Sequence, residues 1–407
     1  MLEKSYFHMS DPQELKHRNI SFFPEYTGNS IVNLTSSILN HFEVRSKYPN
    51  LICLPPSDLE NTSTVILLVI DGLGYEYLQS YGKNSLLSKY LIGKVTSVFP
   101  SSTASAMPSF YTGLAPLNHA ITGWFTYLKE LGVVSTILPL TTRAFRNSIT
   151  NGVRTTTAIF QCQSIFDYLK AQNYFLLPEI IKDSEFSTFF GGKGIRVGFK
   201  NLRDLFNKLL SILRQDKNQK FILGYWTGFD RIIHFEGTKS EATLQHFQNI
   251  NLELGTFLEI LETENLKKTT KILITADHGL IDIPPDRTIQ LKDHSQLQST
   301  LALPLCGDYR TVFFYVRPSQ VTKFEEYIMN HLNHVGTLVK AENLVDQGYF
   351  GLYDPHPRFF DRVGDYVFIM KENYAFMDNL LGEDVRVLIG NHGGLSKEEL
   401  YVPLSII

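Results

Sequence analysis

Six side chains in this sequence are of the types that bind transition metals, and they fall in four short clusters. Three are aspartates and three are histidines: Asp71, Asp230, His234, Asp277, His278 and His392. Carboxylates and imidazoles together suit zinc, and also manganese or iron. Asp230 and His234 are four residues apart, which brings both side chains to one face of a helical turn. Six ligands are enough for two metal ions, and two ions about 3.5 to 4 Å apart form a clamp suited to phosphoryl transfer.

A hydroxyl-rich segment offers the nucleophile that such a centre would need. The residues Pro100-Ser-Ser-Thr103 open a stretch with a helix-like pattern. A hydroxyl in the first turn of a helix lies near unpaired backbone N–H groups, which favour a bound phosphate, and a metal ion can activate the alcohol. Spacing alone leaves Ser101, Ser102 and Thr103 as alternatives. We expect Pro108 to kink or break this helix unless the helix begins late enough to place it in the first turn.

Each cluster of ligands follows a short apolar run that is typical of a buried strand. The runs span residues 63–70, 220–226, 271–275 and 385–389. They do not alternate between polar and apolar residues, which is the pattern of strands covered on both faces of a parallel sheet. Helical patterns at 201–214 and 240–261 lie between them. The sequence therefore predicts an α/β fold, in which ligands collect beyond the carboxyl ends of the strands.

Residues 289–370 interrupt this alternation of strand-like runs and helical patterns. Strand-like runs at 309–316 and 362–370 flank a helical pattern at 320–332. We interpret the segment as a small α+β insertion within a single catalytic domain that spans residues 1–407. Its role is expected to be a lid or side wall over the site, with simple packing decoration as the alternative.

The composition excludes several classes of protein. The 407 residues carry 38 Lys and Arg against 41 Asp and Glu, so the chain lacks the basic surface of a dedicated binder of nucleic-acid polymers. We expect no membrane span, because no apolar run approaches the roughly 18 to 20 residues that a bilayer crossing requires. Cys53, Cys162 and Cys306 are widely spaced and fit buried thiols better than a disulfide framework. A cytoplasmic location is the default expectation, and secretion without an N-terminal signal remains open.

Taken in order along the chain, five motifs resemble those of the alkaline phosphatase superfamily, and specifically its type I phosphodiesterase/nucleotide pyrophosphatase branch. They are Val69-Ile-Asp-Gly-Leu-Gly74, Phe99-Pro-Ser-Ser-Thr103 with the Tyr111-Thr-Gly113 that follows, Asp230 with His234, Asp277-His-Gly279 and Asn391-His-Gly-Gly394. The resemblance covers most of the chain. It implies an alkaline phosphatase-like, mostly parallel sheet flanked by helices. It also implies two divalent metal ions, typically zinc, and hydrolysis of phosphodiester or pyrophosphate bonds.

The resemblance also assigns roles to individual residues. Thr103, nine residues before Thr112, falls at the position of the family's nucleophile and would form a covalent phosphothreonine. One ion would be held by Asp230, His234 and His392. The other would be held by Asp71, Asp277, His278 and the Thr103 hydroxyl oxygen.

Trp124 departs from the family pattern, which has an asparagine 21 residues after the nucleophile to bind a phosphate oxygen. The substrate is expected to be a small phosphorylated molecule, with nucleotides among the candidates. The aromatic residues Trp124, Phe125 and Tyr127 could stack on a nucleobase or simply pack in the core. A phosphomonoesterase or phosphonate hydrolase on the same core is the alternative enzyme. A nucleotide-binding protein with a vestigial metal site is the alternative of another class.

Overall fold

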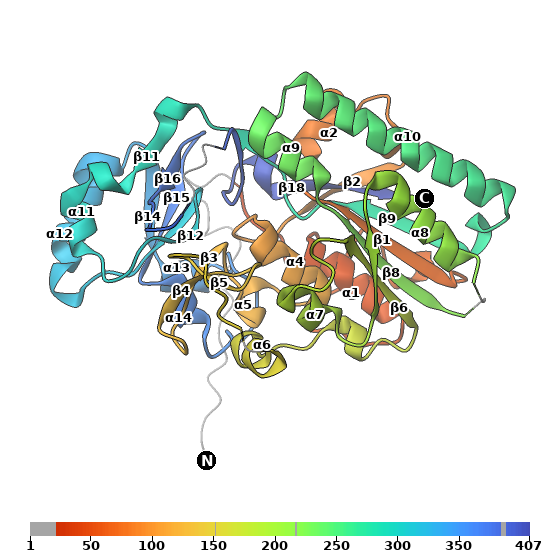
Figure 1. Cartoon of the computed structure of the whole chain (residues 1–407), viewed down its shortest axis with the longest axis horizontal. Coiled ribbons are helices and arrows are strands. Elements are labelled where there is room, and N and C mark those ends of the chain that lie inside the picture. Colours follow the sequence, from red (N-terminus) through yellow and green to blue (C-terminus); the bar gives the residue numbers. More distant parts are fainter. Residues whose placement is uncertain (1–21, 151, 216–217, 384–387) are drawn as a thin grey trace, which may run out of the picture.

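A seven-stranded sheet forms the centre of the computed structural model, which describes residues 22–150, 152–215, 218–383 and 388–407 (Figure 1). In spatial order its strands are β2 (Leu91–Thr96), β18 (Tyr401–Ile406), β9 (Thr270–Thr275), β1 (Thr64–Ile70), β8 (Lys220–Trp226), β6 (Gln172–Pro178) and β7 (Ile195–Phe199). The strands from β9 to β7 are parallel, and β18 and β2 form an antiparallel edge. The prediction of a mostly parallel α/β sheet is therefore confirmed.

The central strands are those that the apolar runs predicted. All seven residues of β1 are buried, because layers of helices cover both faces of the sheet. β8 and β9 lie on either side of β1 in register, so the ends of all three strands meet at one edge. The expected strand at 385–389 falls mostly outside the described residues, and Leu388 and Ile389, which are described, belong to no strand.

Helices flank the sheet on both sides (Figure 1). The patterns at 201–214 and 240–261 are confirmed by α8 (Leu202–Leu213) and α10 (Glu241–Thr263). One layer contains α2 (Tyr75–Tyr81), α9 (Gly228–Glu236) and α10, and the other contains α1 (Ile31–His41), α4 (Thr103–Thr112) and α7 (Glu185–Gly191). Among the helices of the described residues, none combines the length and apolar character that a bilayer crossing requires.

Pro108 lies inside α4, where the helix continues through it to Thr112. The helix neither breaks at this residue nor begins late enough to place it in the first turn. Thr112 Oγ1 donates to the carbonyl of Pro108 at 2.7 Å, and Gly113 then ends the helix at φ 68°. Glycine is favoured there because a left-handed backbone carries no Cβ penalty for it.

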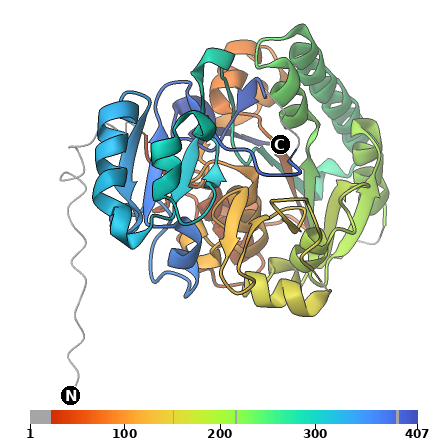
Figure 2. The same cartoon turned by 60° about the vertical axis from the view of Figure 1, so that its left-hand side comes forward.

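A second sheet of seven strands lies beside the first (Figures 1 and 2). Its order is β14 (Gly336–Lys340), β15 (Tyr366–Met370), β13 (Thr311–Phe314), β12 (Cys306–Asp308), β3 (Phe125–Leu128), β4 (Val133–Thr136) and β5 (Thr141–Thr142). Strands from the 289–370 segment therefore share a sheet with strands from 125–142. The segment's helical pattern is α12 (Val321–Tyr327), extended by a π-helical turn over Ile328–Leu332. Four of the sheet's strands thus come from this segment.

Candidate metal centre and active site

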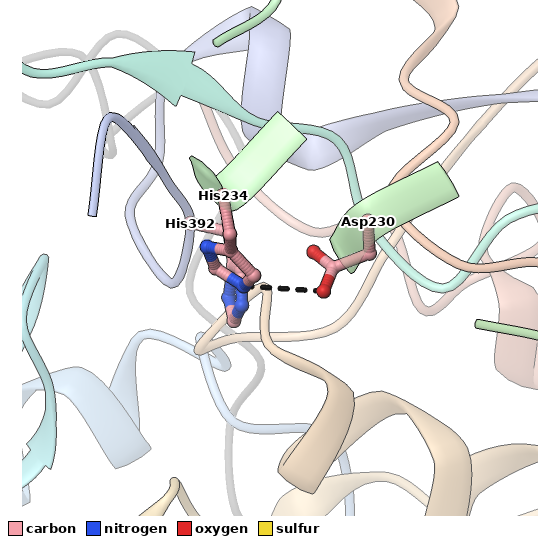
Figure 3. A group of neighbouring side chains, drawn as sticks. All are labelled: Asp230, His234 and His392. Atoms are coloured by element: carbon pink, nitrogen blue, oxygen red, sulfur yellow. Dashed lines mark ion pairs between the residues drawn. The ribbon is translucent and has the colours of Figure 1, made fainter. Parts of the chain in front are cut away.

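One cluster of ligands lies at the carboxyl end of β8 (Figure 3). Asp230 and His234 stand one turn apart on α9, which begins two residues after that strand, and His234 Nε2 lies 3.1 Å from Asp230 Oδ2. His392 joins them from the loop after β17 (Gly390–Asn391). The Nδ1 of His234 lies 2.8 Å from the carbonyl of Gly390. A proton on Nδ1 satisfies that carbonyl and leaves Nε2 as the ligand atom.

A second cluster lies at the ends of the neighbouring strands. Asp71 follows β1, and Asp277 and His278 follow β9; all three side chains are buried. His278 Nε2 lies 3.5 Å from both Asp71 Oδ1 and Asp277 Oδ2. Its Nδ1 lies 3.1 Å from the carbonyl of Gly279, so this imidazole is also oriented by its backbone.

The two clusters are adjacent, because histidines from each stack on one another. The rings of His278 and His392 are 3.9 Å apart at their centroids and inclined by 26°. The six side chains that the sequence singled out thus form two groups of three at one edge of the sheet. Each group offers three ligand atoms that lie within 4.8 Å of one another.

The electrostatics of the site reflect this crowding of charge. Burial raises the pKa of Asp71 well above its usual range, and two neighbouring carboxylates raise it further. Burial alone would also raise the pKa of Asp230, but the imidazole of His234 holds it below its usual range. For His234 burial acts to lower the pKa, and Asp230 outweighs it, so that pKa is raised. Burial lowers the pKa of His392 well below its usual range.

The donor set fits divalent cations. Within the described residues, three buried ligand atoms have no hydrogen-bond partner: Asp230 Oδ1, Asp277 Oδ2 and His392 Nδ1. A buried carboxylate oxygen or imidazole nitrogen without a partner is costly, and a metal ion removes that cost. Each cluster offers a mixture of carboxylate and imidazole ligands, which suits zinc.

Of the three candidate hydroxyls, that of Thr103 lies at the second cluster. Thr103 is the first residue of α4, and its Oγ1 lies 3.0 Å from His278 Nε2 and 3.5 Å from Asp71 Oδ1. Ser101 Oγ instead donates to the carbonyl of Gly394 at 2.6 Å, and Ser102 Oγ donates to Asp308 Oδ1 at 2.9 Å. The two serine hydroxyls are therefore engaged elsewhere, with Gly394 and with Asp308 of β12.

A cavity of about 790 Å³ opens over the cluster of Asp230, His234 and His392, and Asp71 and Thr103 also line it. Much of its wall is apolar, with Leu138, Leu177, Ile181, Phe186 and Phe235 among the lining residues. Trp124 and Phe125 also line the cavity, and the Trp124 side chain is partly exposed there. Tyr127 is not among the lining residues, and its ring lies 5.5 Å from that of Tyr315.

Two residues of the site were not predicted. Tyr225, near the end of β8, donates its hydroxyl to Asp71 Oδ2 and lines the cavity. Asp308, at the end of β12, accepts from Ser102 Oγ and from the backbone N–H of Trp124. A tyrosine at the carboxyl end of a strand that carries ligands was a usable signal for Tyr225. No sequence signal pointed to Asp308, because its hydrogen bonds to Ser102 and Trp124 depend on the pairing of β12 with β3.

The parallel sheet and the ordered ligand clusters at its edge define a member of the alkaline phosphatase superfamily. The family model for type I phosphodiesterase / nucleotide pyrophosphatase matches residues 65–395, and the chain belongs to this family of hydrolases. An uncharacterised pyrophosphatase/phosphodiesterase of Schizosaccharomyces pombe is 24% identical over 260 residues, which are 60% of this chain and 51% of that protein. Human ectonucleotide pyrophosphatase/phosphodiesterase family member 5 is 24% identical over 178 residues, 42% of this chain and 32% of that protein.

Solved structures support the same fold. Murine ectonucleotide pyrophosphatase/phosphodiesterase 5 matches with a TM-score of 0.62 at 16% identity, covering 84% of this chain and 87% of that one. An inactive variant of the murine protein in complex with AMP matches with the same TM-score at 17% identity, with the same coverage. At this identity the likeness shows the fold alone. The chain spans about half the length of the fission yeast relative and about a third of the human one.

Proposed function

We propose that this protein is a two-metal hydrolase that cleaves phosphodiester or pyrophosphate bonds through a covalent phosphothreonine on Thr103. The observation that carries the proposal is the position of the Thr103 hydroxyl at the N-terminus of α4, within 3.5 Å of His278 and Asp71. Family membership supports the reaction class, and the unpartnered ligand atoms support the metal centre.

The ligand sets divide as the two clusters do. Asp230, His234 and His392 would hold one ion, and Asp71, Asp277, His278 and the Thr103 oxygen would hold the other. Zinc suits these ligands best, with manganese or iron as alternatives. When bound, the two ions supply charge stabilisation to the attacking and leaving oxygens of an in-line displacement.

The residues of the chain then perform a two-step transfer. Thr103 Oγ1 attacks phosphorus, forming the Thr103–phosphate bond as the bond to the leaving alcohol or nucleotide breaks. Backbone N–H groups in the first turn of α4 are placed to hold a phosphoryl oxygen, because the N-terminus of a helix carries partial positive charge. Water then cleaves the phosphothreonine, which regenerates the threonine hydroxyl and releases the second product.

The cavity supports a small substrate with an organic group beside its phosphate. Its apolar wall favours an aromatic or aliphatic substituent, and Trp124 is placed to stack on a nucleobase. The AMP complex of the murine protein makes a nucleotide the first candidate to test.

A cytoplasmic location remains a prediction.

Initial rates on bis- and mono-(p-nitrophenyl) phosphate test the reaction class. We expect the diester to be cleaved faster, because the cavity has apolar wall for a second substituent. A strong preference for the monoester would favour the alternative enzyme, a phosphomonoesterase, which Trp124 in place of the family asparagine keeps open. Protein that holds no metal and gains no activity with added zinc or manganese would favour a binding protein with a vestigial site.

A further inference from the structure

One residue outside the ligand set, Glu399, contacts both the loop that carries His392 and the loop that carries His278. Glu399, on the short helix α15 (Lys397–Leu400), is fully buried, and its carboxylate receives the side chain of Arg310. Arg310 Nε donates to Oε1 at 3.1 Å and Nη2 donates to Oε2 at 2.8 Å. Arg310 is also fully buried. Although burial alone would raise the pKa of Glu399, the guanidinium holds it below its usual range, so this carboxylate is ionised.

Glu399 contacts the loop that carries His392. Its Oε1 also accepts the backbone N–H of Gly394 at 2.8 Å, two residues beyond that ligand. A Cβ on Gly394 would lie only 2.7 Å from Oε2, so the glycine allows the carboxylate to reach the loop. The carbonyl of Gly394 in turn accepts Ser101 Oγ at 2.6 Å, two residues before Thr103.

The same helix contacts the loop of the second cluster. The carbonyl of Glu399 accepts the backbone N–H of Gly279, next to His278, at 2.8 Å. A Cβ on Gly279 would lie 2.0 Å from the carbonyl oxygen of Glu398, so the two backbones are in close contact. One residue of α15 therefore binds a backbone group beside a histidine of each cluster.

The cationic partner comes from the other sheet. Arg310 lies in the turn between β12 and β13, and Nη1 donates to the carbonyl of Tyr374 at 2.5 Å. Thr311, the next residue, donates its Oγ1 to the carbonyl of Gly393 at 2.6 Å. The 289–370 segment thus reaches the His392 loop directly through Thr311, and through Arg310 by way of Glu399.

We propose that Arg310 and Glu399 are positioning residues that fix the His392 loop against the His278 loop, and so set the separation of the two metal sites. The proposal rests on the proposed metal centre. It gives the 289–370 segment a function in the assembly of the site, beside the lid or side wall expected from the sequence. Partners that orient metal ligands commonly change metal affinity by about 10- to 100-fold when they are removed.

Zinc affinity of the chelator-treated protein, measured by competition with a chromophoric zinc chelator, tests this proposal. We expect Glu399→Gln to weaken the binding of at least one zinc by about tenfold or more. Glu130→Gln is the control, because Glu130, although more exposed than Glu399, pairs with the buried Arg362 at 2.9 Å. Within the described residues, neither side chain forms a hydrogen bond to the loops that carry His278 and His392. The zinc affinity of this control should stay within about twofold of wild type, since distant sites act independently.

The double variant Arg310→Met/Glu399→Leu separates positioning from stability. Replacing both charges leaves neither one buried without a partner, so the thermal midpoint should recover relative to Glu399→Gln. Zinc affinity should stay weak, because the leucine offers the N–H of Gly394 no acceptor. Wild-type affinity in Glu399→Gln, or affinity that recovers together with the midpoint in the double variant, would overturn the positioning role alone. A wild-type protein that binds no zinc would overturn the metal centre as well.

Discussion

Replacing Asp308 by asparagine should stabilise the metal-free protein at alkaline pH and much less at acidic pH. Burial raises the pKa of this carboxyl from 3.8 to about 7. Between these values the native state keeps a proton that the unfolded state has lost, so the free energy of unfolding falls as pH rises. A difference of about three pKa units corresponds to about 4 kcal/mol, all of it lost above pH 7.

Asparagine does not titrate, and its Oδ1 can still accept from Ser102 Oγ and the N–H of Trp124. At pH 5 the wild-type protein has lost only the part of this free energy of unfolding that disappears between pH 3.8 and 5. The increase in the free energy of unfolding caused by Asp308→Asn should therefore be larger at pH 8 than at pH 5 by about 3 kcal/mol.

Urea unfolding of both proteins at pH 5 and pH 8, with chelator present, measures this difference. Asp286→Asn is the control, because Asp286 is exposed and the substitution makes the same change of charge. If Asp308→Asn shifts the free energy of unfolding equally at the two pH values, the assigned protonation of Asp308 is wrong.

Three further predictions concern the metal centre. His234→Ala should remove about one of two zinc equivalents in elemental analysis, because the cluster of Asp71, Asp277 and His278 stays intact; loss of both or neither would contradict the division into two sites. Tyr225→Phe should weaken zinc binding by about tenfold or more in a chelator competition, because Asp71 Oδ2 loses its donor; unchanged affinity would show that this hydroxyl does not orient Asp71. Chelation should abolish phosphodiesterase activity and added zinc should restore it, and rates that survive complete zinc removal would exclude metal-dependent hydrolysis.

The parts of the fold that follow from local pattern could be predicted. The runs that became β1, β8 and β9 are apolar without alternation because helices cover both faces of their sheet. Parallel neighbours end at the same edge, so ligands far apart in sequence were expected to meet there. The predicted helices α8 and α10 are likewise amphipathic along their own lengths.

The parts that depend on distant pairing could not be predicted. Arg310 and Glu399 are 89 residues apart, and no sequence pattern around either residue identifies the other as its partner. The second sheet pairs β3 with β12 through Phe125 and Gly307, and β6, β7, β8 and β9 of the first sheet lie between these two residues in the sequence. Pro108 was expected to break or kink α4, yet the helix continues through it with all ten of its residues buried. Tertiary packing can override local propensity in this way.

The central claim is that Thr103, and neither neighbouring serine, is the nucleophile. The most direct measurement is the turnover of Thr103→Ala, Thr103→Ser, Ser101→Ala and Ser102→Ala on bis-(p-nitrophenyl) phosphate, with zinc content determined on the same samples. Thr103→Ala should keep most of its zinc, because six other ligands remain, yet lose several orders of magnitude in kcat. Thr103→Ser should retain measurable activity because the hydroxyl survives.

The serine variants should lose no more than a hydrogen bond worth about 0.5 to 1.5 kcal/mol, since Ser101 and Ser102 donate to Gly394 and Asp308. This pattern of rates, at equal zinc content, is what a phosphothreonine intermediate predicts. Near-normal turnover by Thr103→Ala, or a collapse of turnover in Ser102→Ala instead, would contradict it.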